Sequence, residues 1–440
     1  MRVLHLVAGA GGMYCGSCLQ GNTLVGALRK QGVDATLVPL YTPILTDEAD
    51  QSLPRVAMGG VNVFLDQMLP LWRSAPYWVR RMLDRPALLL WAASRGGATN
   101  PEQVAGLCVS MLRGEEGRQH RELSRLIDWF ACELRPDIVH LNNLLLVGVA
   151  RQIRTRLGVP VVSSLAGEDL FLEGLPQPQR TEALLLLRER GGELDALIAP
   201  NTYFAEHMAQ YVGLPRERIH IIPIGLDLDG HSRPDIERPP QPTSHARIGY
   251  LARICPAKGL HLLIEAIGLL VREGQLPEAT AVVAGTLHPD DHRYLVEIER
   301  RVANEGLQER FQYLGQIDRA GKIGFLRSLD VFCLPTVYRE SKGLPALEAL
   351  ANGVPVVLPA HGAFPEMIAE VGGGETFEPN SARSLADALM RVLGDREPFR
   401  KQALAAQRVV HQRFSADAMA HKIHSLYRHL LDESPPLERE

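Results

Sequence analysis

The sequence has 440 residues, of which 46% are hydrophobic and 22% are charged. At about 150 residues for a typical domain, this length and this ordinary globular composition predict two or three domains. The formal net charge is −4 and no block of Lys or Arg provides a basic surface, so no nucleic-acid partner is expected.

The start of the chain and its cysteine content indicate a cytoplasmic protein. Residues 1–8 run directly into glycines, which is typical of a buried first strand and not of a secretory signal. No segment reaches the roughly 18 apolar residues of a membrane span. Six cysteines are too few for a disulfide framework in a chain of this length, so a reducing compartment is expected.

Short apolar runs alternate with helical patterns through the first half, which predicts βαβ units and a parallel sheet. Their nearly continuous apolar character is typical of strands that are covered on both faces. The strands are expected over residues 2–7, 35–39, 137–141, 159–163, 196–199 and 219–224.

A glycine-rich loop over residues 9–14 follows the first strand. Glycines allow the backbone to approach a phosphate or a sugar closely, so Gly11 and Gly12 are candidate substrate-binding residues, with a simple tight turn as the alternative. Tyr14 stands where the third glycine of a dinucleotide fingerprint belongs, and residues 38–40 lack the acid that would hold an NAD ribose. An NAD-dependent oxidoreductase is therefore disfavoured.

Cys15 and Cys18 form a Cys-x-x-Cys motif directly after this loop. Such a motif is compatible with a redox pair or with half of a zinc site. The other four cysteines are scattered and provide no second pair at metal-binding spacing. The simplest interpretation is a run of small residues at the start of a helix.

Residues 63–117 interrupt the alternation with a long helical insertion. It contains Trp72, Tyr77, Trp78 and Trp91, and Arg80 and Arg81 precede an apolar run. Long insertions often carry function, and apolar residues beside cations are suited to a lipid-linked acceptor or to peripheral membrane contact. The alternative is a helical pair that buries its aromatic side chains against the first domain.

A proline-rich segment over residues 230–242 marks a domain boundary. We therefore expect one domain over 1–229 and a second over 243–414. In the second domain, strands are expected over residues 247–251, 280–284, 311–314, 331–334 and 354–358. Ser415 is a candidate cap of a terminal helix over 415–432, in which apolar residues recur at helical spacing.

Two motifs of the second half carry the chemistry. Arg253 and Lys258 follow an expected strand, and a guanidinium with an ammonium can share the charge of a leaving diphosphate. Glu340 follows the strand at 331–334, and Glu348 lies one turn into an expected helix over 344–351. Taken singly, each spacing is also compatible with solvated surface charges.

The start of that second helix is suited to an anion. Pro345 fits the first helical turn, where its missing N–H costs nothing, and Gly343 allows a ligand to approach the backbone. A diphosphate above the amides of Gly343 and Leu344 would gain from the helix N-terminus.

Together these motifs resemble the nucleotide-sugar site of family 4 glycosyltransferases, which are retaining enzymes of the GT-B architecture. The resemblance implies an α/β fold with two doubly wound, Rossmann-like domains that face a central cleft, and a C-terminal helix that crosses back to the first domain. It implies that Glu340 accepts hydrogen bonds from the donor sugar and Glu348 from the ribose, and that the loop of Gly11 and Gly12 faces the donor phosphates and the acceptor.

One position departs from the family pattern. Many relatives carry a His just before Gly167, where this sequence has Ala166, which puts the sugar contact from this domain in doubt. Asp169 follows closely and is a candidate substrate-binding residue, or else a helix cap. The metal-like His288 and His292 are expected on a surface loop, and no metal or other cofactor is expected.

The resulting hypothesis is a hexosyltransferase that moves a sugar from a nucleoside diphosphate donor to a hydroxyl acceptor, in polysaccharide or glycolipid synthesis. The alternatives are a nucleotide-sugar epimerase or hydrolase of the same fold, and a non-catalytic nucleotide-sugar-binding protein. The expected location is cytoplasmic, with the insertion as a candidate contact to the inner face of the membrane. The base, the sugar, the acceptor, the linkage and the oligomeric state are not determined by the sequence.

Overall fold

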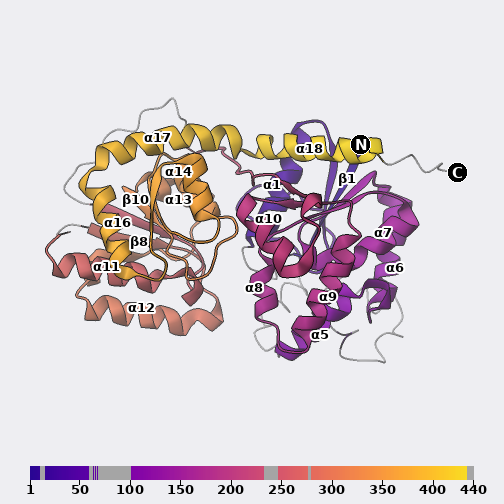
Figure 1. The fold of residues 1–440 in the computed structure, drawn as a ribbon, viewed down its shortest axis with the longest axis horizontal. Coiled ribbons are helices and arrows are strands. Elements are labelled where there is room, and N and C mark those ends of the chain that lie inside the picture. Colours follow the sequence, from indigo (N-terminus) through magenta and orange to yellow (C-terminus); the bar gives the residue numbers. More distant parts are fainter. Residues whose placement is uncertain are drawn as a thin grey trace. The chain divides into compact units, whose positions relative to one another are not determined.

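The computed structural model describes residues 1–9, 15–58, 63, 65, 67, 101–231, 246–275 and 279–433. The chain divides into two compact units, the first formed by residues 1–225 with the chain from Ala416, and the second by Leu226–Ser415. Each unit is built on a six-stranded sheet flanked by helices (Figure 1). The predicted α/β fold class with two doubly wound sheets is confirmed.

The sheet of the first unit has the order β2-β1-β3-β4-β5-β6, and all its neighbouring strands are parallel. Because the strand order reverses at β1, the end of β1 and the start of the next helix lie at the topological switch point. The strands are β1 (Arg2–Val7), β2 (Asp34–Pro39), β3 (Ile138–Leu141), β4 (Val161–Ser164), β5 (Ala196–Ala199) and β6 (Ile219–Ile221).

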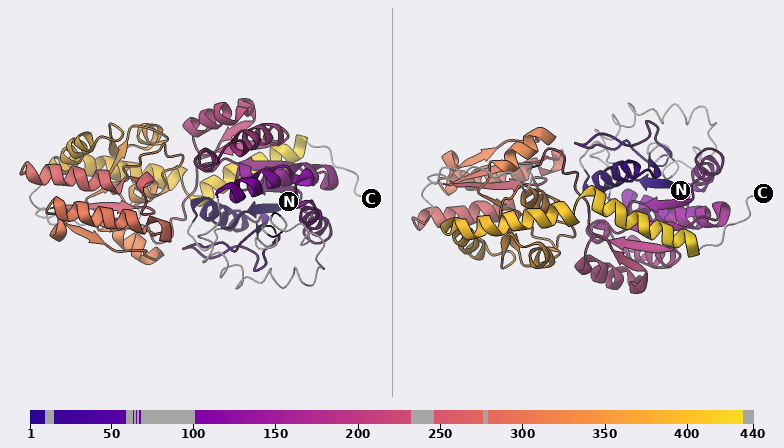
Figure 2. Two further views of the ribbon diagram at one scale, coloured as in Figure 1. Left: turned by 90° about the horizontal axis from the view of Figure 1, so that it is seen from below. Right: turned by 90° about the horizontal axis from the view of Figure 1, so that it is seen from above.

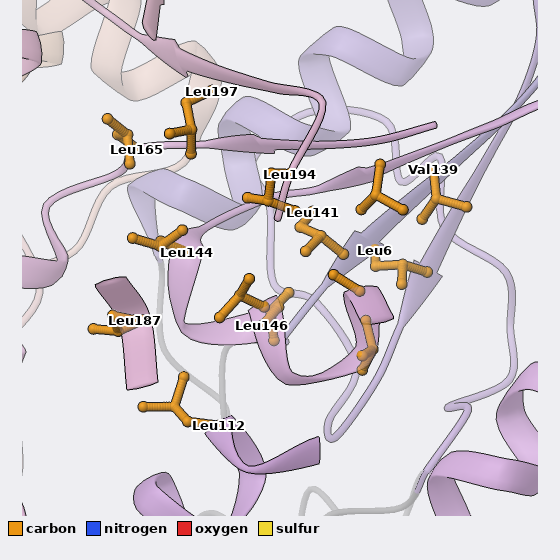
Figure 3. Packing of buried hydrophobic residues seen from close by; sticks show 14 of the residues in the cluster. Leu6, Leu112, Val139, Leu141, Leu144, Leu146, Leu165, Leu187, Leu194 and Leu197 are labelled. Carbon is orange, nitrogen blue, oxygen red and sulfur yellow. The ribbon is translucent and has the colours of Figure 1, made fainter. Parts of the chain in front are cut away.

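The helices of the first unit cover both faces of the sheet and form two cores. One core is rich in leucine and includes Leu6 and Leu141 of the sheet with Leu112 and Leu187 of the helices (Figure 3). The other core packs α1 and α18 against the opposite face. The helices are α1 (Gly16–Lys30), α5 (Pro101–Leu112), α6 (His120–Trp129), α7 (Ala150–Leu157), α8 (Glu168–Glu173), α9 (Gln179–Gly192), α10 (Thr202–Met208) and α18 (Ala416–Glu433).

The C-terminal helix α18 belongs to the first unit, as predicted. Met419, Ile423, Leu426 and Leu430 are buried along one side of it, in the core that α1 also lines. The helical spacing of these residues was sufficient to predict both the helix and its buried face.

The sheet of the second unit has the order β12-β11-β10-β7-β8-β9, again with parallel neighbours. Its strands are β7 (Ala246–Leu251), β8 (Ala279–Ala284), β9 (Phe311–Tyr313), β10 (Val331–Cys333), β11 (Val356–Pro359) and β12 (Gly374–Phe377). The sequence did not predict β12, because this edge strand reads Gly-Glu-Thr-Phe and only Phe377 is buried. A half-exposed edge strand lacks the continuous apolar pattern that identified the central strands.

Helices flank the second sheet on both faces as well (Figure 2). Helix α11 packs against α16, and α14 packs against α17. The helices are α11 (Leu260–Arg272), α12 (His292–Asn304), α13 (Arg319–Arg327), α14 (Leu344–Ala351), α15 (Phe364–Val371), α16 (Ala382–Gly394) and α17 (Arg396–Arg413).

Helix α5 lies within the predicted insertion over 63–117. The insertion's other candidate residues lie outside the described part of the chain, namely Trp72, Tyr77, Trp78, Arg80, Arg81 and Trp91. Gly11 and Gly12 also lie outside it. None of the helices in the described ranges combines the length and apolar character that crossing a bilayer requires.

Candidate functional site

The candidate site of the second unit lies at the carboxyl ends of three adjacent strands. β10 lies between β11 and β7 in the sheet, and all three strands are parallel. Their carboxyl ends therefore meet at one edge of the sheet, where ligands bind in doubly wound folds. The loop after β7 carries Arg253 and Lys258, and the loop after β10 carries Glu340.

The loops after β7 and β10 are held against each other through the backbone. The N–H of Val337 donates to the carbonyl oxygen of Ala257 at 2.9 Å. Gly259 has a φ of +73°, and a Cβ atom there would lie 1.7 Å from the carbonyl oxygen of Pro335. Only glycine fits this position, so the sequence Lys-Gly at the start of α11 allows the contact that brings Lys258 to the second loop.

Lys258, Tyr338 and Glu340 form one hydrogen-bonded cluster across these loops. The ammonium of Lys258 donates to Oε2 of Glu340 at 2.8 Å and also to the hydroxyl of Tyr338. The Tyr338 hydroxyl donates to the same Oε2 at 2.6 Å. On the other oxygen, Oε1, Glu340 accepts from the backbone N–H of Ser341 at 3.2 Å. Both carboxylate oxygens are therefore fixed in position.

The surroundings of Glu340 keep it ionised. Burial alone would raise the pKa of this carboxyl, but the charge and hydrogen bond of Lys258 and the hydrogen bond of Tyr338 lower the pKa to about 2. For Tyr338, burial first and the negative charge of Glu340 second raise the pKa well above its usual range. The cluster is thus a carboxylate between an ammonium and a neutral phenol.

Arg253 lies in the same loop as Lys258 but is more exposed, with 54% of its side chain accessible against 22% for Lys258. Its Nε lies 4.0 Å from Oδ2 of Asp291 and 3.4 Å from the sulfur of Cys255. The buried hydroxyl of Tyr250 lies 3.4 Å from the carbonyl oxygens of both Arg253 and Lys258 and supports the loop from below. The guanidinium is therefore available to an anion that approaches from solvent.

Helix α14 begins at the predicted position with an N-terminus suited to an anion. Gly343 precedes it with a φ of +69°, and a Cβ atom there would lie 2.8 Å from Cε1 of Phe364. No side chain caps the helix, and Pro345 occupies its first turn. The first backbone N–H groups of a helix have no partner within the helix. The N–H of Leu344, the first residue of α14, can therefore bind a negatively charged group.

Glu348 forms an ion pair that the sequence did not indicate. Its Oε1 lies 2.7 Å from the ammonium of Lys322 on α13, and both side chains are largely buried. Its backbone carbonyl accepts from the side-chain amide of Asn352 at 2.8 Å, and that amide also lies 2.8 Å from Nδ1 of His231. The carboxylate is therefore anchored through a neighbouring helix.

In the first unit, Asp169 lies in the first turn of α8 and pairs with His207. Its Oδ2 is 2.9 Å from Nε2 of His207 on α10. The imidazole ring stacks between Tyr203 and Tyr211, with centroid distances of 5.9 Å and 5.6 Å. Asp169 thus belongs to a polar and aromatic cluster of its own unit. The backbone N–H of Ala166 donates to Glu168.

Sequence reasoning missed three residues of these clusters, namely Tyr338, Lys322 and His207. Tyr338 precedes Glu340 by two residues, so an extended loop would have suggested that both side chains face one side. Lys322 and His207 have no such signal, because each meets its partner only through the packing of two helices.

The described ranges contain no group of three or more His, Cys, Asp or Glu side chains positioned to hold a metal ion. In the metal-like segment 288–292, Nδ1 of His288 lies 3.3 Å from Asp290, next to a short 3-10 turn over Pro289–Asp291.

The sequence matches two family models, one on each half. Residues 232–427 match the model described as "Glycosyl transferases group 1", and residues 90–229 match "Glycosyltransferase Family 4". A phosphatidyl-myo-inositol mannosyltransferase of Mycobacterium leprae is 29% identical over 211 residues, which are 47% of this chain and 52% of that protein. The chain therefore matches only about half the length of this relative.

A longer match is to a D-inositol 3-phosphate glycosyltransferase of Xylanimonas cellulosilytica. It is 26% identical over 352 residues, which cover 76% of this chain and 79% of that protein. The names of both relatives describe a sugar transferase and contain an inositol compound.

Solved structures share the fold over nearly the whole chain. Sucrose-phosphate synthase from Thermosynechococcus elongatus aligns with a TM-score of 0.72 at 18% identity and covers 99% of this chain and 100% of its own. The HepE protein of Anabaena, in complex with UDP and glucose, aligns with a TM-score of 0.67 at 17% identity and covers 98% and 100%.

Proposed function

Because the chain belongs to the family 4, group 1 glycosyltransferases, we propose that it transfers a sugar from a nucleoside diphosphate donor to a hydroxyl acceptor, with retention of the anomeric configuration. The observation that carries the proposal is the contact between Lys258 and Glu340 at the carboxyl ends of β7 and β10. It places a cation for a diphosphate beside a charged acceptor for sugar hydroxyls.

The proposed leaving-group site consists of Lys258, Arg253 and the N-terminus of α14. When the anomeric C–O bond breaks, both bonding electrons stay with the diphosphate, whose growing negative charge is stabilised by the ammonium, the guanidinium and the amides at Gly343 and Leu344. Lys258 is already positioned by Glu340 and Tyr338, so little reorganisation is needed at that moment.

In this proposal the two carboxylates bind different parts of the donor. Glu340, ionised and held at both oxygens, accepts hydrogen bonds from the sugar hydroxyls. Glu348, held by Lys322, accepts from the ribose hydroxyls. Carboxylates form the stronger, charge-assisted kind of hydrogen bond with hydroxyl donors, so both contacts favour a polyhydroxyl ligand over an apolar one.

The acceptor oxygen forms the new bond to the anomeric carbon on the face that the diphosphate leaves. We propose that a phosphate oxygen of the donor takes the acceptor proton, so the products are the glycoside and the protonated nucleoside diphosphate, and no metal or other cofactor is needed. Gly11, Gly12 and Asp169 are the candidate substrate-binding residues of the first unit.

The names of the relatives suggest inositol compounds as the first acceptors to test. We place the reaction in the cytoplasm, with the segment 63–117 as a candidate contact to a membrane-bound acceptor. Sedimentation with anionic liposomes, which compares the wild type with Arg80→Glu/Arg81→Glu, tests that contact.

The test of the proposed function combines donor binding with turnover. Screening UDP-, GDP- and ADP-sugars by thermal shift identifies the base, since a ligand at 100 times its Kd stabilises the folded state by about 2.7 kcal/mol. The selected donor is then incubated with myo-inositol, inositol phosphate and sugar acceptors, and the products are separated by mass spectrometry. Epimerised or hydrolysed donor without a glycoside, or tight binding without any turnover, would replace the transferase proposal.

A further inference from the structure

The Cys-x-x-Cys motif lies in the first turn of α1 and has no role in the proposed transfer reaction. Cys15 directly precedes the helix, and its carbonyl oxygen accepts the N–H of Leu19 at 2.9 Å, so the helical turn already begins there. Cys18 follows three residues later. Cys15 is thus the extended residue directly before the helix, and Cys18 lies in its first turn.

Both cysteines are reduced in the structure and border the same apolar core, that of α1 and α18. They differ in accessibility, because Cys18 is only 2% exposed whereas Cys15 is half-buried. A thiol pair of this kind gives an incoming disulfide one sulfur to react with and keeps the second sulfur close by to complete the exchange.

The backbone at Cys15 gives the pair room to close. Its φ of −120° and ψ of 117° are extended and not helical, so its side chain is less restricted than one inside the helix. A disulfide needs Cβ atoms about 3.5–4.5 Å apart, and a residue just outside the helix can adjust its backbone to reach that distance.

Cys15 stands at the N-terminus of a 15-residue helix that has no acidic residue in its first turn. The positive end of a helix dipole is favourable to an approaching anion.

The rest of this turn is fixed from its inner side. The side-chain amide of Asn142 donates to the hydroxyl of Ser17 at 2.7 Å, and its carbonyl oxygen lies 3.1 Å from Nε2 of His5 on β1. A Cβ atom at Gly21 would lie 2.8 Å from that same carbonyl oxygen, so α1 is packed closely against the sheet. A disulfide between Cys15 and Cys18 would therefore form in a turn whose position against the sheet is already fixed by these contacts.

A zinc site is the other chemistry of this motif, and the structure does not favour it. A structural zinc ion requires about four protein ligands. No group of three or more potential metal-binding side chains occurs in the described part of the chain, at this turn or elsewhere.

We propose that Cys15 and Cys18 form a reversible dithiol–disulfide pair that is oxidised by small-molecule disulfides such as oxidised glutathione. The sulfur of Cys15 attacks the oxidant and displaces one glutathione thiolate. The sulfur of Cys18 then attacks the mixed disulfide and displaces the second. One S–S bond forms in the protein, and the two electrons and two protons lost by the thiols end on two molecules of reduced glutathione.

The experiment uses the full chain, reduced and then equilibrated with defined ratios of oxidised to reduced glutathione. Remaining thiols are alkylated, and tryptic peptides are analysed by mass spectrometry. Cleavage after Arg2 and Arg29 releases one peptide, residues 3–29, that contains both Cys15 and Cys18 and no other cysteine. The exposed Cys132 lies in a different peptide without a second cysteine and is the internal control.

In the wild type, peptide 3–29 should lose two hydrogens through an internal disulfide, at an oxidant ratio about tenfold lower than the ratio that glutathionylates Cys132, because the second step is intramolecular. Cys18→Ser should retain glutathione on Cys15, whereas Cys15→Ser should leave Cys18 unmodified.

Two results would overturn the proposal. One is that Cys15 and Cys18 stay fully alkylatable at ratios that modify Cys132. The other is that each carries its own glutathione without an internal disulfide. Because the wild-type peptide decides between these outcomes, a variant that fails to fold does not weaken the test.

Discussion

The chemistry of Glu340 depends on its neighbours Lys258 and Tyr338. Removing Lys258 would leave a buried carboxylate without its counter-charge, so Lys258→Ala changes both the proposed leaving-group site and the stability of the loop. Tyr338→Phe is a milder change, because it removes one hydrogen bond and keeps the ring.

The first prediction concerns the cations. We expect Arg253→Ala and Lys258→Ala each to lower kcat about a hundredfold, because each removes a preorganised group that stabilises the departing diphosphate by about 3 kcal/mol. Steady-state kinetics with the identified donor measures the effect. Arg383→Ala is the matched control, because Arg383 is also a half-exposed arginine in an ion pair, with Glu273. Rates near wild type for both cation variants would contradict the assigned roles.

The second prediction separates the proposed ribose contact of Glu348 from the cluster that Tyr338 forms with Glu340. Glu348→Ala should weaken the binding of free nucleoside diphosphate roughly tenfold or more, since a hydrogen bond to a charged group contributes about 1.5–3 kcal/mol. Tyr338→Phe should leave this affinity unchanged and lower kcat only. Calorimetric titration of the free nucleotide measures the affinity. Glu265→Ala, which breaks an exposed ion pair between Glu265 on α11 and Arg301 on α12, is the control. Equal affinities in wild type and Glu348→Ala would exclude the ribose contact.

At the scale of elements, α18 is fixed to the first sheet through a buried polar chain. The hydroxyl of Tyr427 lies 2.6 Å from Nδ1 of His140 on β3, and Nε2 of His140 lies 2.8 Å from the hydroxyl of Ser164 on β4. The ring of His5 on β1 meets that of His140 at a centroid distance of 4.4 Å. Three strands and one helix distant in sequence are thus linked through a single imidazole.

The third prediction concerns this link. Tyr427→Phe should lower the free energy of unfolding of the first unit by about 1–3 kcal/mol, because a buried nitrogen of His140 loses its partner. Urea unfolding followed by tryptophan fluorescence reports this unit, since all four tryptophans fall within residues 1–225. His421→Ala, on the exposed side of α18, should change stability little. A Tyr427→Phe protein as stable as wild type would show that the hydroxyl contributes nothing to docking.

At the scale of the whole molecule, buried histidines make stability depend on pH. Burial lowers the pKa of His5 to about 4 and that of His231 to about 3, and it lowers the pKa of His140 well below 6.5. The folded state therefore holds these rings neutral at pH values at which the unfolded chain binds protons. These histidines therefore do not change stability above pH 6.5, and they destabilise the folded state increasingly as the pH falls toward their folded pKa values.

The fourth prediction follows from that sign. Between pH 6.5 and about 4, each such histidine should reduce the free energy of unfolding by about 1.4 kcal/mol per pH unit. Below the ordinary carboxyl range, Glu340 adds a further loss, because its folded pKa of about 2 lies below its unfolded value. Urea unfolding from pH 8 to pH 4 measures the slope that the histidines cause. In His5→Gln one proton fewer is taken up on unfolding, so the free energy of unfolding should change by about 1.4 kcal/mol less per pH unit. An unchanged slope would contradict the neutral buried state of His5.

Much of the architecture followed from the sequence alone, because local patterns specify local structure. Continuous apolar runs identified the central strands of both sheets, and apolar spacing identified α18 and its buried face. Helix α14 was predicted to the residue, since Gly343, Pro345 and Asn352 set its two ends. The edge strand β12 escaped prediction because its sequence, Gly-Glu-Thr-Phe, contains no apolar run.

The candidate residues of the site could be identified from local motifs, because the spacings that mark Arg253, Lys258, Glu340 and Glu348 are short. Which of these side chains meet depends on the packing of whole elements. Lys258 reaches Glu340 because β7 and β10 are neighbours in the sheet, and Glu348 meets Lys322 because α13 lies beside α14. Such contacts join residues distant in the chain through the packing of whole elements, and no local pattern of residues records that packing.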